Sequence, residues 1–488
     1  MIAVPSVKLA YLAPELALVA GALAVLMLDA FARDGRSEAT NRFLGWFSAA
    51  TSMGAALACG AIMRLPNEPV LGVYGGQLGA LMSMSIALVT AVVCLAGIRF
   101  TELRNGSLGA WYALVLMASA GATYLTRTAD LISTYLALET LSMPLYALAA
   151  YDRQRDASLE AGLKYFLLGS VASAVLLYGG VLLYGVAGSM DFTVLLSTSS
   201  DSLLWRVGWN MLAFGLLFKL AIVPLHFWTP DVYQGSPTAS TMYMAGVVKI
   251  SVAAVFARLL LGNVDVYARL APIVMMLAMA SMLAGNLLAL TQHNLKRMLA
   301  YSSIGHAGYI LAGLTAGGVA GLTGAVTYLW LYALLTLAAF AILLWLGNRP
   351  TEGLEVETLR GLGRQHPWIA FAFSVVLLGM AGIPPLAGFF GKWVVLRAIL
   401  DAGHTTTAIV LVASSAIGAY YYLRPIVVMY MQAPIEEIDV PAGRPALFGQ
   451  WVMGGLLVVL VALIFVLGIR GNAVFWLAQQ SALKALGQ

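Results

Sequence analysis

Runs of apolar residues, each roughly 20 residues long, recur along this chain from end to end and constrain its fold more than any other feature. Each run is long enough to cross the hydrocarbon core of a bilayer as a helix. Of the 488 residues, 61% are hydrophobic and only 10% are charged, which exceeds the apolar content that a soluble domain needs. Strand-length alternation is absent, so a membrane β-barrel is not expected. The sequence therefore predicts an all-α polytopic membrane protein.

The runs predict about fourteen transmembrane helices. The first run, residues 9–28, is too long for the apolar part of a typical signal peptide, and no clear cleavage site follows it, so it is taken as a span. The longest gaps, residues 347–366 and 431–448, are expected to be loops rather than soluble domains. The expected helix starts lie near residues 9, 42, 76, 109, 129, 160, 205, 238, 270, 297, 320, 367, 404 and 449.

Basic residues in the gaps orient the predicted helices, because cytoplasmic gaps carry more of them. The larger set follows the odd-numbered spans, and this excess predicts that both termini lie on the outer side of the membrane. The 14 residues of that set are Arg33, Arg36, Arg42, Arg99, Arg104, Arg153, Arg155, Lys296, Arg297, Arg349, Arg360, Arg364, Arg424 and Arg444. The 9 residues of the termini and other gaps are Lys8, Arg64, Arg127, Arg206, Arg258, Arg269, Arg397, Arg470 and Lys484.

Five charged residues fall inside predicted spans: Glu139, Lys164, Lys219, Lys249 and Lys392. A charge at the bilayer centre costs roughly 2.5–3.5 kcal/mol on insertion scales, so such residues usually face a wet interior or one another. A buried ion pair that only holds two helices together is one interpretation. Ionisable groups in successive helices favour a proton path, since a desolvated lysine releases its proton and an arginine does not. Lys164 lies near the inner end of its helix, where snorkelling to the interface is an alternative.

Four of the five histidines divide into two groups. His226 and His306 lie in or beside spans and could relay protons near neutral pH, with simple helix packing as the alternative. His293 and His366 are expected at loop edges. No two histidines have the spacing of a haem or metal site on one helix.

Two spans carry proline breaks. The stretch FGLLFKLAIVPLHFWTP, residues 214–230, contains Pro224, and GMAGIPPLAGFFGKW contains Pro384 and Pro385. Broken helices are tolerated at membrane depth only where protein or water satisfies the freed backbone groups, and transporters with inverted repeats place working sites there. The breaks lie about five spans apart. Because five is an odd number, the second unit would have the opposite orientation in the membrane from the first. The predicted units are residues 1–108 (three helices), 109–263 and 264–430 (five helices each), and 431–488 (a last helix and tail).

Several kinds of site are not expected in this chain. It contains no Walker A motif, no GxGxxG after a strand, no CxxC and no Ser-His-Asp constellation. Cys59 and Cys94 lie in separate apolar runs and are interpreted as packing residues. No nucleotide, flavin, haem, iron–sulfur or metal site is therefore predicted. The modest net charge of +5 suits a membrane surface and not nucleic acid, and energy would come from an ion gradient or a partner.

Motifs along nearly the whole chain carry a family resemblance. Residues 218–260, the segment around Glu139, NLKRMLAYSSIGHAGYI (294–310) and GIPPLAGFFGKW (382–393) follow in the expected order and spacing. In these the chain resembles the antiporter-like membrane subunits of respiratory complex I and the Mrp cation/proton antiporters. The stretch PDVYQGSPT, the length, and the lack of a long C-terminal helical extension are most similar to the subunit N branch of the NADH–quinone oxidoreductase.

The resemblance implies fourteen helices with two inverted five-helix repeats, and proton translocation driven by quinone reduction elsewhere in a complex. Glu139 matches the family's helix-5 glutamate, Lys219 the lysine of the first broken helix and Lys249 the lysine of the next helix. Lys392 matches the charged residue of the second broken helix, and Lys164 also matches a family position. By this resemblance Glu139 would stabilise protonated Lys219, whose proton would pass to Lys249, and Lys392 would release a proton outward.

The same resemblance implies the surroundings of the chain. It would be a multi-pass subunit of a bacterial inner-membrane NADH–quinone oxidoreductase, with other membrane subunits and the lipid bilayer as partners. Quinone, NADH, FMN and iron–sulfur clusters would belong to partner subunits, leaving no cofactor here. Two alternatives stay open: a subunit of an Mrp-type Na⁺/H⁺ antiporter, and a scaffold that binds its neighbours without moving protons.

Overall fold

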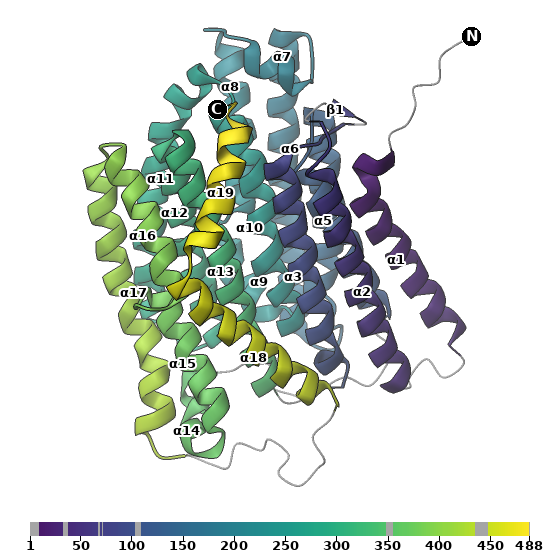
Figure 1. Cartoon of the computed structure of the whole chain (residues 1–488), viewed down its shortest axis with the longest axis vertical. Helices are drawn as coiled ribbons and strands as arrows, with labels where there is room; N and C mark the ends of the chain where they lie inside the picture. The colour runs from purple at the N-terminus through teal and green to yellow at the C-terminus, as the bar shows by residue number, and fades with distance from the viewer. Residues whose placement is uncertain are drawn as a thin grey trace.

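The computed structural model describes residues 9–32, 38–66, 69–70, 72–102, 109–347, 355–434 and 448–487. These residues form a tall bundle of α-helices with one short two-stranded hairpin (Figure 1). Two almost completely buried helices, α10 and α13, lie at the centre of the bundle. The predicted class, an all-α polytopic membrane protein, is confirmed.

In chain order, the elements fall into four groups. The N-terminal elements are η1 (Leu9–Leu12), α1 (Ala13–Phe31), α2 (Glu38–Ile62), β1 (Pro69–Val70), β2 (Val73–Tyr74) and α3 (Gln77–Glu102). The next are α4 (Gly109–Leu125), α5 (Leu131–Ala149), α6 (Asp156–Ala187), α7 (Phe192–Ser197), α8 (Leu203–Lys219), α9 (Trp228–Gly235) and α10 (Thr238–Leu261). Then come α11 (Val264–Leu290), α12 (Leu295–Ala316), α13 (Gly318–Leu346), η2 (Val356–Leu359), α14 (Leu362–Gln365), α15 (Pro367–Ala381), α16 (Ala387–Asp401) and α17 (Thr405–Met431). The last are α18 (Phe448–Ile469) and α19 (Asn472–Ala485), so the predicted tail is helical.

Ten helices in the described ranges are long and apolar enough to cross a membrane: α1 with η1, α2, α3, α5, α6, α10, α11, α13, α17 and α18. Two shorter apolar helices are α4 and α15. A helix begins close to each of the fourteen predicted starts, and the largest difference is near residue 270, where α11 begins at Val264. Of the other two predicted spans, α8 ends at Lys219 after 17 residues and α12 contains several polar residues, so neither is both long and apolar enough to be counted with these helices.

Parts of the sequence-based orientation argument need correction. The gap at 347–366 is not a plain loop, because its described part contains η2 and α14. Lys296 lies in the first turn of α12 and is 0% exposed, with its ammonium donating to the backbone oxygen of Ser236 at 2.7 Å. Six of the counted basic residues, and most of the gap at 431–448, lie outside the described residues: Lys8, Arg33, Arg36, Arg104, Arg349 and Arg444.

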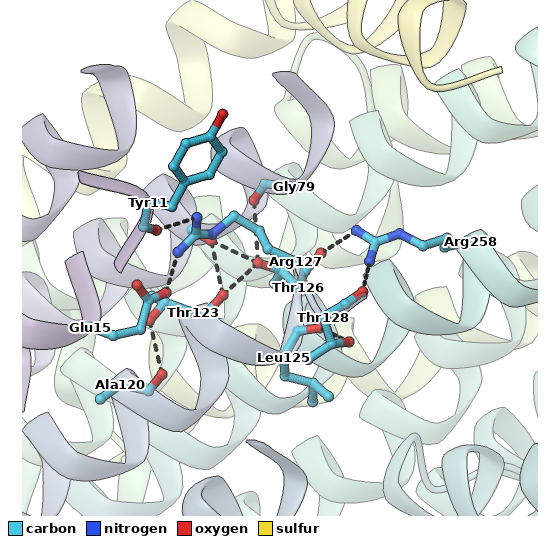
Figure 2. A network of polar contacts seen from close by, with 11 residues as sticks. Tyr11, Glu15, Gly79, Ala120, Thr123, Leu125, Thr126, Arg127, Thr128 and Arg258 are labelled. Atoms are coloured by element: carbon cyan, nitrogen blue, oxygen red, sulfur yellow. Dashed lines mark hydrogen bonds and ion pairs between the residues drawn. The ribbon is translucent and has the colours of Figure 1, made fainter. Parts of the chain in front are cut away.

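A buried arginine ties the N-terminal helices to the rest of the bundle (Figure 2). Arg127, in the turn between α4 and α5, is completely buried, although the sequence suggested a surface gap. Its guanidinium donates to the backbone oxygen of Tyr11 at 2.8 Å and pairs with the Glu15 carboxylate at 2.5 Å. From the other side, Arg258 of α10 donates to two backbone oxygens of the same turn. The turn therefore joins α1, α4 and α10.

Both predicted helix breaks are present and have the same local structure. Each has the sequence Ile-x-Pro-Leu, at residues 222–225 and 383–386. The isoleucine N–H donates to the carbonyl five residues back, at 3.2 Å in the first break and 3.1 Å in the second. This is the closing bond of a Schellman motif, which needs a left-handed residue just before it. That residue is Ala221 (φ 60°) in the first break and Gly382 (φ 86°) in the second.

Candidate functional site

Lys219 is held at the end of α8, directly before the first break, and is 4% exposed. Its ammonium donates to the Ser142 hydroxyl at 2.8 Å and the Tyr146 hydroxyl at 3.0 Å, both on α5. It also lies 5.2 Å from the centre of the Tyr146 ring and 5.7 Å from that of Tyr165. The last turn of a helix favours a cation, and aromatic faces do so too. The helix end and the aromatic rings therefore offset part of the cost of burying this charge.

Glu139 lies on α5, one turn before Ser142, and its side chain is half-buried. It forms no ion pair within 4.0 Å with Lys219, and its Oε1 has no hydrogen-bond partner in the described part of the chain. Glu139 and Lys219 therefore do not pair directly. The reason is that the hydroxyls of Ser142 and Tyr146 lie nearer the ammonium and take its hydrogen bonds. Glu139 thus lies one helical turn along α5 from Ser142, which contacts Lys219 directly.

Lys249 lies at the middle of α10 and is 3% exposed. Its ammonium donates to both the backbone oxygen and the hydroxyl of Ser303 on α12, and to the Tyr332 hydroxyl on α13 at 3.5 Å. The Tyr332 ring centre is 4.8 Å away. No carboxylate among the described residues lies within 4.0 Å. Lys249 is thus surrounded by neutral hydroxyl groups, and it shares no hydrogen-bond partner with Lys219.

His306 continues the polar path from Lys249. Its ring packs on the same Tyr332 ring, with 4.7 Å between the centres. Its Nε2 bonds the Tyr422 hydroxyl at 2.9 Å and its Nδ1 bonds the Tyr328 hydroxyl. Because every ring nitrogen has a hydroxyl partner, the imidazole is fixed in orientation and both of its nitrogens can exchange a proton. The sequence predicted His306 as a candidate but gave no sign of these tyrosines.

Lys392 lies on α16, five residues after the start of that helix, and is largely buried. Its ammonium donates to the backbone oxygens of Met380 at 3.0 Å and Ala381 at 2.8 Å, and to the Ser415 hydroxyl at 2.7 Å. The two carbonyls belong to the last turn of α15, where a helix leaves its carbonyls unpaired. The second break therefore supplies two of the three acceptors for this lysine.

Tyr309 lies between His306 and Lys392. Its ring centre is 5.7 Å from that of His306 and 5.4 Å from the Lys392 ammonium. Its hydroxyl bonds Ser414 at 3.1 Å and accepts from Asn286 at 3.4 Å. Lys249, His306 and Lys392 are thus joined by consecutive contacts through tyrosines of α12 and α13. These tyrosines were missed because nothing in the sequence separates them from the rest of the chain's 21 tyrosines.

Lys164 lies apart from this buried path. Its side chain is 40% exposed and pairs with Glu160 at 2.5 Å and with Asp231 of α9 at 2.9 Å. Asp231 also pairs with Arg297 of α12 at 2.6 Å. This three-helix ion network near the start of α6 was not expected from the sequence.

The remaining histidines have different surroundings. His226 lies within the first break and is half-buried, and its Nδ1 has no partner in the described residues. His293 bonds Arg424 at 2.9 Å, and His366 begins α15 with its ring 5.2 Å from that of Trp345. Burial lowers the pKa of His366. Both therefore lie at helix edges, as the sequence predicted. No three His, Cys, Asp or Glu side chains in the described ranges are grouped to hold a metal ion.

Comparison with protein families gives one match over most of the chain. Residues 128–418 match the model of the family described as NADH:quinone oxidoreductase/Mrp antiporter, transmembrane. The chain is 39% identical over 472 residues to NADH-quinone oxidoreductase subunit N of Halorhodospira halophila, covering 96% of each chain. It is 36% identical over 429 residues to the subunit N of Nitrosomonas europaea, covering 86% of this chain and 88% of that one.

Solved structures with the same fold include a chain of respiratory complex I from Thermus thermophilus. The two share 32% identity and a TM-score of 0.77, over 96% of this chain and 99% of that chain. A chain of the Mrp complex from a Dietzia species matches with a TM-score of 0.82 but only 22% identity, over 98% and 97% of the two chains. At that identity the second likeness concerns the fold alone.

Proposed function

The chain belongs to the NADH:quinone oxidoreductase/Mrp antiporter family, and from this premise we propose that it is the proton-translocating subunit N of a bacterial NADH–quinone oxidoreductase. The observation that carries the proposal is the buried path from Lys249 through His306 to Lys392. A path of titratable groups between two helix breaks is what proton transfer through a membrane requires. Quinone reduction would occur in partner subunits, which would also hold NADH, FMN and the iron–sulfur clusters.

The three lysines would carry the proton in sequence. Protonated Lys219 is supported by the hydroxyls of Ser142 and Tyr146 and by the field of Glu139, one turn away. A change that moves α5 or the first break would weaken that support and release the proton toward Lys249. Lys249 would pass it to His306 through the hydroxyl groups of Ser303 and Tyr332.

Lys392 is the proposed outward end of the path. Its three acceptors are two backbone carbonyls and a serine hydroxyl, all neutral. They accept hydrogen bonds from the ammonium without the electrostatic attraction of a carboxylate, so the proton can leave. Lys164 and His226 are assigned supporting roles at most, since neither touches this path in the described residues.

The proposed setting is the bacterial inner membrane, among other membrane subunits of the oxidoreductase. Support comes from the relatives' names and from helices that are long and apolar enough to span a membrane. The start of α1 and the end of α19 lie toward the same end of the bundle (Figure 1). We assign that end to the outer side because of the basic residues in the alternate gaps.

The two alternatives make different predictions. An Mrp-type antiporter subunit would transport Na⁺ without quinone reductase subunits. The family model covers both kinds of protein and the fold is shared, so neither favours this alternative. A scaffold would assemble with its neighbours and pump fully after its buried charges are removed.

Substitution of Lys249 tests the proposal. Lys249→Met keeps the side-chain volume in the buried site while removing the titratable group. We expect the complex to assemble on native gels and to lose most proton pumping per quinone reduced. Lys484→Met, in the exposed last turn of α19, is the matched control and should pump normally. Full pumping by an assembled Lys249→Met complex would reject the relay in favour of the scaffold.

A further inference from the structure

A cavity of about 310 Å³ lies between the beginning of α8 and the beginning of α11, away from the proton path. Two side-chain contacts hold its rim together: Arg269 of α11 pairs with Asp201, and Ser199 donates to Asp265 of α11. We propose that this cavity binds the headgroup of a phospholipid with a primary ammonium, of the phosphatidylethanolamine class. The proposal is independent of the proton-relay function.

The first observation is a buried hydrogen-bond donor that has no acceptor. Trp209 lines the cavity and is 4% exposed, yet its indole Nε1 has no partner in the described residues. A buried donor left without an acceptor costs roughly 1–3 kcal/mol, so such groups usually mark a missing partner. Indole N–H can only donate, which means that the missing partner is an acceptor such as a phosphate oxygen.

The second observation is an arginine free to bind an anion. Arg206 also lines the cavity, three residues before Trp209 on α8, and is exposed. It donates to the backbone oxygen of Asp201 at 2.9 Å, and no carboxylate of the described chain lies within 4.0 Å of it. A guanidinium binds phosphate through several parallel hydrogen bonds. Arg206 and the Trp209 N–H therefore form a pair of donors for one phosphate group.

The third observation selects the kind of headgroup. Asp265 lines the same cavity and accepts from Ser199, but no basic side chain of the described chain lies within 4.0 Å of it. A carboxylate beside a phosphate site repels a purely anionic ligand and attracts a cation. A headgroup with a phosphate and a primary ammonium matches both charges, and the ammonium can donate three hydrogen bonds to Asp265.

The place of the cavity favours a lipid over a soluble phosphate compound. The flanking residues Leu203 and Val264 are 71% and 83% exposed, and Ile273, at the cavity wall, is 45% exposed. Large apolar side chains exposed beside tryptophan and arginine at a helix end are typical of the membrane interface. An acyl chain could therefore follow Ile273 along α11 while the headgroup lies at the helix starts.

Photo-cross-linking of the intact assembly tests this site. The probes are phosphatidylethanolamine, phosphatidylcholine and phosphatidylglycerol, each with a photoreactive group next to the headgroup. We expect the ethanolamine lipid to label peptides containing residues 203–210 and 264–273 more strongly than the other two. Trp209→Phe and Arg206→Ala should each lower that labelling about tenfold, the effect of one hydrogen bond to a charged group. Asp265→Asn should remove the preference over phosphatidylglycerol.

Controls come from the same chain. Trp451→Phe removes an exposed indole on α18, and Arg397→Ala removes an exposed arginine on α16, and neither residue lines the cavity. Labelling of the two peptides should be unchanged in both. Equal labelling by all three lipids, or labelling that survives Trp209→Phe at full strength, would overturn the proposal. Trp209→Phe keeps an aromatic ring in the packing, so the variant should assemble normally. Native gels check this and separate a loss of lipid binding from misfolding.

Discussion

The ammonium of Lys392 lies 2.8 Å from the backbone oxygen of Ala381, the last residue of the helix that ends at the second break. A lysine on one half of a broken helix thus satisfies a carbonyl that the break leaves unpaired. Structure and proton transfer depend here on the same nitrogen atom.

Substitutions at Lys392 can separate these two tasks. Lys392→Met removes the donor to the Met380 carbonyl, while Ser415 still donates to that of Ala381. It should destabilise the complex by about 1–3 kcal/mol as well as stop pumping. Lys392→Arg still donates but does not release a proton, so assembly and thermal stability should be kept while pumping is lost. Thermal unfolding in detergent and proton pumping in vesicles measure the two effects. An arginine variant that pumps at the normal rate would exclude proton release from this residue.

Tyr422 is predicted to hold His306 in the orientation that proton transfer requires. Tyr422→Phe removes the hydroxyl at 2.9 Å from His306 Nε2 and should slow pumping by up to about tenfold, without loss of assembly. The neighbouring Tyr420 is 67% exposed, so Tyr420→Phe is the matched control and should behave as the unmodified chain. Equal pumping by both variants would contradict the role of Tyr422.

Two residues of α5, Tyr146 and Glu139, should both be energetically coupled to Lys219, but by different interactions. Tyr146 is neutral and accepts a hydrogen bond from Lys219, whereas Glu139 is charged and makes no direct contact with it. In double-mutant cycles on pumping rate, Tyr146→Phe with Lys219→Met should be strongly non-additive, by about 0.5–3 kcal/mol. Glu139→Gln with Lys219→Met should also be non-additive, and Glu139→Asp should do less harm than Glu139→Gln. Additive losses for both pairs would mean that α5 does not act through Lys219.

The buried Glu15–Arg127 pair should matter for stability more than for turnover (Figure 2). Glu15→Gln leaves a completely buried guanidinium without its counter-charge, which costs about 3–5 kcal/mol when a buried pair is broken. The double variant Glu15→Leu with Arg127→Met should be less destabilised than either single variant. Thermal unfolding of the four proteins checks this. A double variant that unfolds at the lowest temperature of the four would refute the argument.

Both chain ends are predicted on the outer side and residues 355–366 on the inner side. Reporter fusions at the C-terminus and after residue 360 should therefore be active on opposite faces. A C-terminal reporter that is active in the cytoplasm would reverse the predicted membrane orientation of the whole bundle.

The sequence predicted the helices and the buried lysines, because both depend on local properties. An apolar run of sufficient length is a helix wherever it is placed in the bilayer, and a lysine such as Lys249 is conspicuous within it. The apolar runs located helix ends less well. Lys296 and Arg127 were assigned to surface gaps, whereas helix packing buries both.

The connections between the lysines could not be predicted. They depend on which hydroxyls meet across helices that are distant in sequence, such as Tyr422 of α17 and His306 of α12. A tyrosine in an apolar run is ordinary, so it gives no signal of its own. The same reason applies to Glu139 and Lys219: their charges gave no sign that the hydroxyls of Ser142 and Tyr146 would take the lysine's hydrogen bonds.

The left-handed residue is an alanine in the first break and a glycine in the second. The two breaks therefore differ in backbone strain. Gly382 adopts its positive φ without steric cost, whereas Ala221 stores about 1–2 kcal/mol in the same conformation. Relaxing Ala221 to a right-handed conformation would lengthen α8 and turn Lys219 relative to α5. The first break is therefore strained next to its lysine and can release free energy when it changes conformation, whereas the second break is unstrained.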